Sequence, residues 1–143
     1  MKPVLTRTIA ALAFTTVVLF STLSTQGVHA LTPQTASGIA YITGGVTIDE
    51  RQEMMAQRNN YSLLLKVAAK SGKYLGDSVV KITDQAGATV FECTTDGPWL
   101  LVDLPVGRYT VSATGLEITQ SQKILISKKT RREITMYWNV EER

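Results

Sequence analysis

Few side chains in this sequence are suited to nucleophilic or acid–base chemistry. The 143 residues include one histidine, His29, and one cysteine, Cys93. Ser-His-Asp triads, Cys-His pairs and His-ligated zinc sites all need histidine. His29 falls in a leader that we expect to be removed, and a single cysteine cannot form an intramolecular disulfide. We therefore predict that the mature protein is no enzyme and has no catalytic residue, no cofactor and no metal site.

Carboxylates and the thiol leave narrower alternatives. Asp84, Asp96 and Asp103 could bind calcium, and the last two could act in catalysis. A hard cation needs several convergent oxygens, but these acids fall in different predicted turns, where solvated loop positions are the favoured interpretation. Cys93 alternates with Phe91 in a strand-like stretch, which favours a small buried side chain. A reactive or intermolecularly bonded thiol is the alternative.

Residues 1–30 have the three parts of a secretory signal peptide. The start is basic, an apolar stretch covers 9–23, and Val28-His29-Ala30 fits the small-residue rule for cleavage. We predict cleavage after Ala30, which gives a mature protein in the periplasm or outside the cell. The alternative is a retained membrane anchor, but a spanning helix needs roughly 20 apolar residues, and this stretch is shorter and contains hydroxyl residues.

Loss of the leader also changes the net charge. The leader takes two of the 15 Lys and Arg residues and none of the 12 acids, so the formal charge falls from +3 to +1. A nearly neutral chain gives no electrostatic reason to expect nucleic acid as a partner. We also expect no stable membrane insertion after cleavage. The short basic run at 128–132 is best explained as a solvated turn before a strand.

The elements that would position these side chains begin with a short strand at 38–43 and one short helix. Thr47 or Asp49 can cap the helix, and acids in its first turns suit the N-terminal end of the helix dipole. A helix of about ten residues is not stable alone. We therefore expect Met54 and Met55 to pack it against the rest of the fold.

From residue 61 the hydrophobic period changes to two. Seven short stretches alternate in this way, with a turn signal about every ten residues, which is typical of a two-sheet sandwich. The predicted fold is all-β: a seven-stranded Greek-key β-sandwich over 61–139, prealbumin-like or Ig-like, with one short N-terminal helix in an extension at 31–60. The positions expected to share inner strand faces are Val80, Ile82, Tyr109, Val111, Ala113, Ile124, Ile126, Ile134, Met136 and Trp138.

Two turn motifs flank the strand at 99–103. Thr95-Asp96-Gly97-Pro98 precedes it, and Leu104-Pro105-Val106-Gly107-Arg108-Tyr109 follows it. In the second motif Pro105 presets the turn, Gly107 permits a positive φ, and Tyr109 offers an amphipathic ring at the sandwich corner. With these motifs, residues 63–138 resemble the carboxypeptidase regulatory-like domain, a transthyretin-like (prealbumin-type) β-sandwich. The first turn is shorter than is usual in that family.

The resemblance implies a module without catalysis of its own. In zinc carboxypeptidases the domain stands beside a catalytic domain, and residues 44–63 also look like those of small exported Gram-negative proteins that carry it. We therefore expect a non-enzymatic periplasmic module that binds a protein or glycan partner. Tyr74, Trp99 and Tyr137 are the candidate anchors. The alternative is that Trp99 and Tyr137 cover a sheet face or pack against the helix.

Two other functional classes have sequence support of different strength. A transthyretin-like hydrolase would need histidines and a C-terminal Tyr-Arg-Gly-Ser motif, and residues 139–143 are Asn-Val-Glu-Glu-Arg. A structural or adhesin module of the Cna-B kind would join Lys66 to Asn139 by an isopeptide bond. That bond also needs a buried acid, and Ala113 stands at the expected position.

Overall fold

The computed structural model describes residues 31–72 and 75–139. This part of the chain forms nine strands, one α-helix and a short 3-10 turn. In chain order they are β1 (Gln34–Ala36), β2 (Ile39–Gly44), α1 (Ile48–Gln57), the 3-10 turn (Arg58–Asn60), β3 (Leu63–Ala69), β4 (Val79–Asp84), β5 (Thr89–Thr94), β6 (Trp99–Val102), β7 (Gly107–Gly115), β8 (Ile118–Ile126) and β9 (Arg132–Trp138). The seven strands predicted for the sandwich correspond to β3–β9, and the short strand predicted at 38–43 corresponds to β2, so β1 alone was not predicted.

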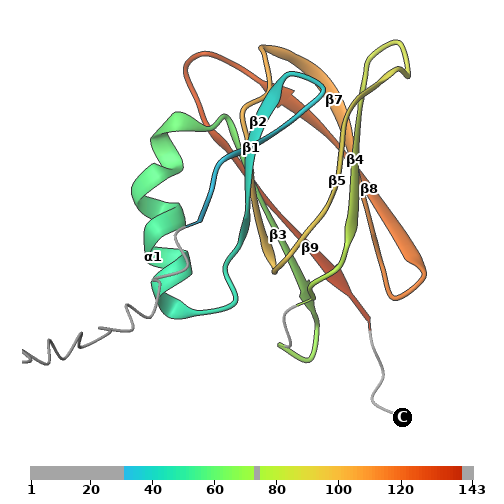
Figure 1. Cartoon of the computed structure of the whole chain (residues 1–143). Helices are drawn as coiled ribbons and strands as arrows, with labels where there is room; N and C mark the ends of the chain where they lie inside the picture. The colour runs from blue at the N-terminus through green and yellow to red at the C-terminus, as the bar shows by residue number, and fades with distance from the viewer. Residues whose placement is uncertain (1–30, 73–74, 140–143) are drawn as a thin grey trace, which may run out of the picture.

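The strands form two sheets, with α1 at one side of the molecule (Figure 1). One sheet has five strands in the order β1-β2-β6-β3-β9, and the other has four in the order β5-β4-β7-β8. Within the described residues, β3 and β9 are the one parallel pair. A predominantly β fold with one short helix is therefore confirmed. Because β1 and β2 join the five-stranded sheet, part of the 31–60 segment lies within the sandwich.

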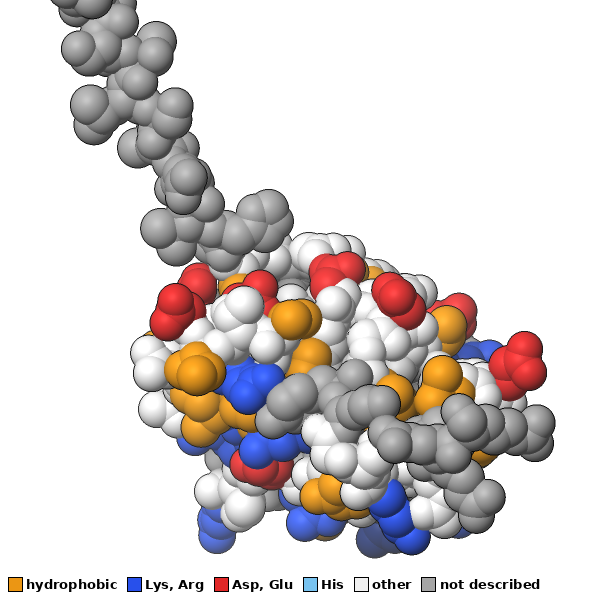
Figure 2. Space-filling view, turned by 90° about the horizontal axis from the view of Figure 1, so that it is seen from below, with side chains coloured by type: hydrophobic (Ala, Val, Ile, Leu, Met, Phe, Trp, Pro, Cys, Tyr) orange, Lys and Arg blue, Asp and Glu red, His pale blue; other side chains and the backbone are white. Residues whose placement is uncertain are grey.

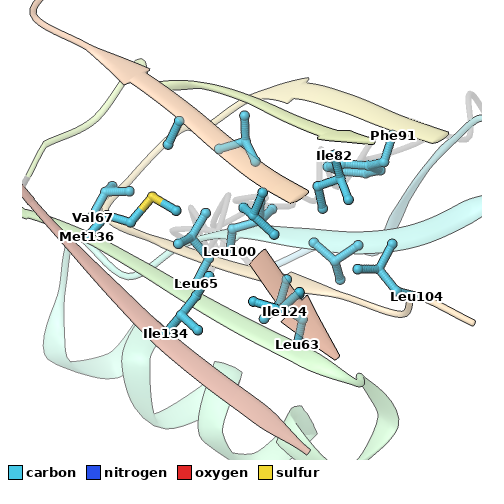
Figure 3. Close-up of a cluster of buried hydrophobic side chains, with 14 of the residues drawn as sticks. Leu63, Leu65, Val67, Ile82, Phe91, Leu100, Leu104, Ile124, Ile134 and Met136 are labelled. Atoms are coloured by element: carbon cyan, nitrogen blue, oxygen red, sulfur yellow. The ribbon is translucent and has the colours of Figure 1, made fainter. Parts of the chain in front are cut away.

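Alternating side chains of both sheets meet in the space between them (Figure 3). Leu65 of β3 and Met136 of β9 lie in the same cluster as Ile82 of β4 and Phe91 of β5. Trp138 is fully buried, and its Nε1 donates to the carbonyl of Ile118 at 2.9 Å, which joins the ends of the two sheets. The inner faces predicted for β4, β8 and β9 are right, because their predicted residues are all buried: Val80, Ile82, Ile124, Ile126, Ile134, Met136 and Trp138.

A capping box starts α1 at Thr47. Thr47 Oγ1 accepts the N–H of Glu50 at 3.2 Å, and the Glu50 carboxylate accepts the N–H of Thr47 at 3.3 Å. Thr47, and not Asp49, is therefore the cap. Met54 is fully buried whereas Met55 is 49% exposed, so the prediction that both methionines dock the helix is right for Met54 only.

Met54 belongs to a second, smaller hydrophobic cluster on the outer face of the five-stranded sheet. Its other buried members are Ile42, Tyr61, Leu64 and Leu101. Leu64 and Leu101 lie opposite each other on β3 and β6, on the side away from the main core. The central strands of this sheet are therefore buried on both faces.

Two predictions fall outside the described residues. These are the signal peptide, residues 1–30, and the candidate anchor Tyr74. Within the described ranges, no helix has the length and apolar character needed to cross a bilayer.

Candidate functional site

The two predicted aromatic anchors that the structure describes lie on one sheet face. Trp99 is the first residue of β6, and Tyr137 is near the end of β9. Their strand neighbours Leu100 and Met136 belong to the core between the sheets. Because side chains alternate along a strand, Trp99 and Tyr137 both lie on the outer face of the five-stranded sheet.

Trp99 is held between the helix and the sheet. The Nζ of Lys66 lies 4.7 Å from its ring centroid, and the guanidinium carbon of Arg51 on α1 lies 5.9 Å away. Arg51 Nε donates to the carbonyl of Gly45 at 2.7 Å, which fixes the arginine. Gly45 itself, with φ +85°, passes so close that a Cβ there would lie 2.9 Å from the Cβ of Trp99. The half-buried Trp99 thus packs beside the helix with cations against its ring.

Lys66 also pairs with Glu133 across β3 and β9. Its Nζ lies 2.6 Å from Glu133 Oε1, and the two side chains are 28% and 50% exposed. In the parallel register Lys66 lies opposite Thr135. Asn139 is four residues further along, or about 13 Å at the usual rise of a strand. The isopeptide alternative needs Lys66 and Asn139 in contact, and this register separates them.

The outer face is open along β9, beyond the helix. Five residues form this surface, which we call the β9 strip: Lys66, Ala68, Glu133, Thr135 and Tyr137. Ala68 and Thr135 are half-buried and leave a low surface between the larger side chains. Tyr137 rises from it with 53% of its surface exposed. The strip combines a projecting aromatic ring with an ordered ion pair.

The acids considered for metal or catalytic chemistry lie apart. Asp84 ends β4, whereas Asp96 follows β5 and Asp103 follows β6. Asp84 Oδ1 accepts the N–H groups of Ala86 and Ala88, each at 2.9 Å, so this carboxylate closes a turn. In the ranges that the structure covers, no group of three His, Cys, Asp or Glu side chains is placed to hold a metal ion.

Cys93 is half-buried on β5 and packs against the main core. Burial raises the pKa of its thiol to about 12, with smaller contributions from the charges of Asp96 and Glu92. The thiol is therefore protonated at neutral pH, and a protonated thiol is a poor nucleophile. The geometry agrees with a small packing side chain, although Cys93 is less buried than predicted.

The corner motif at 104–109 is closed by a hydrogen bond between its own residues. Tyr109 Oη donates to the carbonyl of Pro105 at 2.8 Å, which places the ring across the turn. The φ of Gly107 is not positive, so that prediction is wrong. A Cβ at Gly107 would make ordinary van der Waals contact with the Tyr109 ring, 3.4 Å from its Oη. Gly97, in the other motif, leaves space for the carbonyl of Gly44.

A pocket of about 450 Å³ lies at the end of the four-stranded sheet where β4 finishes. Asp84 and Gln85, residues 108–110 of β7, residues 123–125 of β8, and Arg132 of β9 line it. The sequence interpretation missed this site because its side chains come from strands far apart in the chain. The available signal was the pair of cations, Arg108 and Lys123, on the polar faces of the two strands.

The opposite end of the sandwich, where β9 finishes, has charges of both signs (Figure 2). Asp and Glu side chains gather along one border of this view, Lys and Arg gather toward the other, and hydrophobic side chains lie between them. The described residues at this end therefore do not form one uniformly basic patch, and such a patch would be the electrostatic footprint of nucleic-acid binding.

Comparison with known proteins gives no family for this chain. No family model matches it, and neither a curated protein nor a solved structure matches it. The function is therefore argued below from the site geometry, together with the sequence patterns.

Proposed function

We propose that this protein is an exported, non-enzymatic binding module that holds a protein partner against the β9 strip. The observation that carries the proposal is the 53% exposure of Tyr137 beside the ordered pair of Lys66 and Glu133. Tyrosine is among the residues enriched at protein interfaces and at their energetic hot spots. Its large ring loses little conformational entropy when a partner covers it.

The state of Trp99 favours a protein over a glycan. A sugar ring stacks on an open aromatic face, using the apolar body of the ring. The ring of Trp99 already has Lys66 and Arg51 against it. Of Trp99 and Tyr137, only Tyr137 therefore presents its ring to solvent. A single ring beside fixed charges suits a flat protein surface better than a stacked carbohydrate.

Export and family membership belong to the same proposal. The pattern of residues 1–30 supports a signal peptide cleaved after Ala30, with the mature protein in the bacterial periplasm. The Leu104-Pro105-Val106-Gly107-Arg108-Tyr109 motif supports the carboxypeptidase regulatory-like class, and a Greek-key, prealbumin-like topology is part of the same proposal. Intact mass spectrometry of the protein from the periplasmic fraction tests export, because the mass should be that of a chain beginning at Leu31. A mass that includes residues 1–30 would contradict it.

Site-specific photo-cross-linking tests the binding surface. A photoreactive phenylalanine at position 137 should give one discrete protein adduct in periplasm. The same residue at position 121, exposed on the outer face of the other sheet, is the control and should give none. The partner, once identified and purified, should bind Tyr137→Ala at least about tenfold more weakly than wild type, with Leu125→Ala unchanged.

Three results would contradict the proposal. Equal adducts at positions 121 and 137 would mean that no defined surface binds. Binding of a glycan that depends on Tyr137, without any protein adduct, would favour the carbohydrate alternative. Substrate turnover by the purified protein would contradict the proposal that it is not an enzyme.

A further inference from the structure

We infer that the pocket at the end of the four-stranded sheet binds a phosphate group carried by a small molecule. The proposal is independent of the β9 strip, because the two sites share no residue. The volume of about 450 Å³ lies within the usual range of pockets for small ligands. The identity of the ligand group follows from the charges that line the pocket.

Three cations line the pocket: Arg108, Lys123 and Arg132. Within the described part of the chain, none of these side chains forms an ion pair or donates a hydrogen bond. The single acid of the pocket is Asp84, whose Oδ1 is already bonded to the backbone of its turn. The pocket therefore has a formal charge of +2.

Strand register places two of these cations close together. Arg108 lies opposite Leu125 and Thr110 lies opposite Lys123 in the antiparallel pair of β7 and β8. Arg108 and Lys123 are thus diagonal neighbours on one sheet face, about 7–8 Å apart. That separation lets long side chains reach a single group bound between them. Like charges held this close repel each other, so an anion between them is favoured.

A phosphate monoester matches this arrangement in charge and geometry. It carries about −1.5 to −2 charges at pH 7 and has three strong acceptor oxygens, which balances the +2 of the pocket. The planar fork of Arg108 can bind two oxygens at once, and Lys123 can bind a third. Thr110, opposite Lys123 on the same face, carries a hydroxyl that can serve as a further donor.

The apolar part of the lining indicates which kind of group is attached to the phosphate. Leu125, which lies opposite Arg108 on the same outer face and is 52% exposed, offers an apolar side chain beside the cations. A phosphate attached to an apolar ring should therefore bind more tightly than inorganic phosphate. Inorganic phosphate, phenyl phosphate and vesicles that contain phosphatidic acid are the probes, because each presents the phosphate from a different source.

The test uses the mature protein and two-dimensional amide NMR. Phenyl phosphate should shift the amide signals of residues 84–85, 108–110 and 123–125 in a saturable way below about 10 mM. Inorganic phosphate should bind at the same residues several-fold more weakly. Vesicle binding that also depends on Arg108 would identify a lipid as the source of the phosphate and would support the site.

Matched variants separate a defined site from general charge attraction. Arg108→Gln and Lys123→Gln should each weaken the binding of phenyl phosphate by about tenfold, because each removes a charge-assisted hydrogen bond. The control is Lys81→Gln. Lys81 is exposed on the same outer face but lies opposite Glu92 and does not line the pocket. This variant should leave the affinity unchanged.

Two outcomes would overturn the proposal. One is the absence of any saturable shift at these residues with all three probes. The other is an equal loss of affinity in Lys81→Gln and Arg108→Gln, which would show general charge attraction. All three positions are exposed, so the variants should unfold at the same urea concentration as wild type, and a loss of binding cannot come from misfolding.

Discussion

The outer faces of the two sheets are built in opposite ways. On the five-stranded sheet, Ile42, Leu64 and Leu101 are fully buried, and α1 lies over them. On the four-stranded sheet, the outer positions of β7 and β8 are mainly hydroxyl and charged residues, and no helix of the described chain covers them (Figure 1). Serine and threonine side chains pair directly across these strands, as Ser112 does with Ser121 at 2.7 Å.

The covered face of the five-stranded sheet contributes to stability, whereas the uncovered face of the four-stranded sheet is available for binding. Burial of an aliphatic side chain contributes about 1.5–3 kcal/mol, so the covered face must hold the helix and the sheet together. An exposed hydroxyl pair exchanges hydrogen bonds with water and contributes little. The uncovered face is therefore free to hold cations such as Arg108 and Lys123 without a cost to the core.

Matched leucines give the largest expected difference between the two faces. Leu101→Ala should lower the free energy of unfolding by about 3 kcal/mol, because it leaves a cavity under the helix. Leu125→Ala, on the uncovered face and 52% exposed, should change it by less than about 0.5 kcal/mol. Urea unfolding followed by tryptophan fluorescence measures both. Similar losses in the two variants would contradict the contrast.

Matched methionines test whether the helix is docked by one side chain. Met54→Ala should cost about 2 kcal/mol, which is less than the leucine change because the short helix can shift to fill part of the space. Met55→Ala, on the exposed side of the same helix, should be nearly neutral. Thermal unfolding by circular dichroism distinguishes them. A larger loss for Met55→Ala would mean that the helix docks by another face.

The capping box gives an intermediate effect. Thr47→Ala removes the side-chain acceptor for the N–H of Glu50 and should cost about 1 kcal/mol. Thr130→Ala, in the exposed loop before β9, changes the same residue type without a cap and serves as the control. Amide hydrogen exchange should show faster exchange in 48–52 for Thr47→Ala alone. Unchanged protection there would show that tertiary packing, and not the cap, fixes the start of the helix.

The hydroxyl pairs should give the smallest effect. Ser112→Ala removes one partner of the bond to Ser121, but both positions are accessible to water, so stability should stay within about 0.5 kcal/mol. The variant should also bind phenyl phosphate normally, since Ser112 does not line the pocket. A loss above about 1 kcal/mol in urea unfolding would show that this face also carries stability.

Local patterns predicted much of the fold. The alternation of Ile134, Met136 and Trp138 gave the buried face of β9 correctly, because burial along a strand has a period of two. The helix at 48–57 followed from its cap and acidic first turn. Tyr109 was expected at a corner, and it bonds across the turn to Pro105. Each of these features depends on residues close together in the chain.

Other features had no local signal. Strand β1 is three residues long, and its place at the sheet edge depends on pairing with β2. Gly97 leaves space for the carbonyl of Gly44, a contact between segments that are far apart in the chain. Trp99 was a candidate anchor with packing against the helix as the alternative, and the contacts that Arg51 and Lys66 make with its ring agree with that alternative.

The sequence by itself determined the strands other than β1, the apolar side of most of them, and the start of the helix to within two residues. Tertiary structure alone decided that β3 pairs with β9, which brings Lys66 to Glu133, and that β7, β8 and β9 bring Arg108, Lys123 and Arg132 to one pocket. The physical reason is that periodicity records the burial of each strand one at a time. Contacts between distant strands depend on sheet order, and strands with similar apolar patterns can pair in several orders.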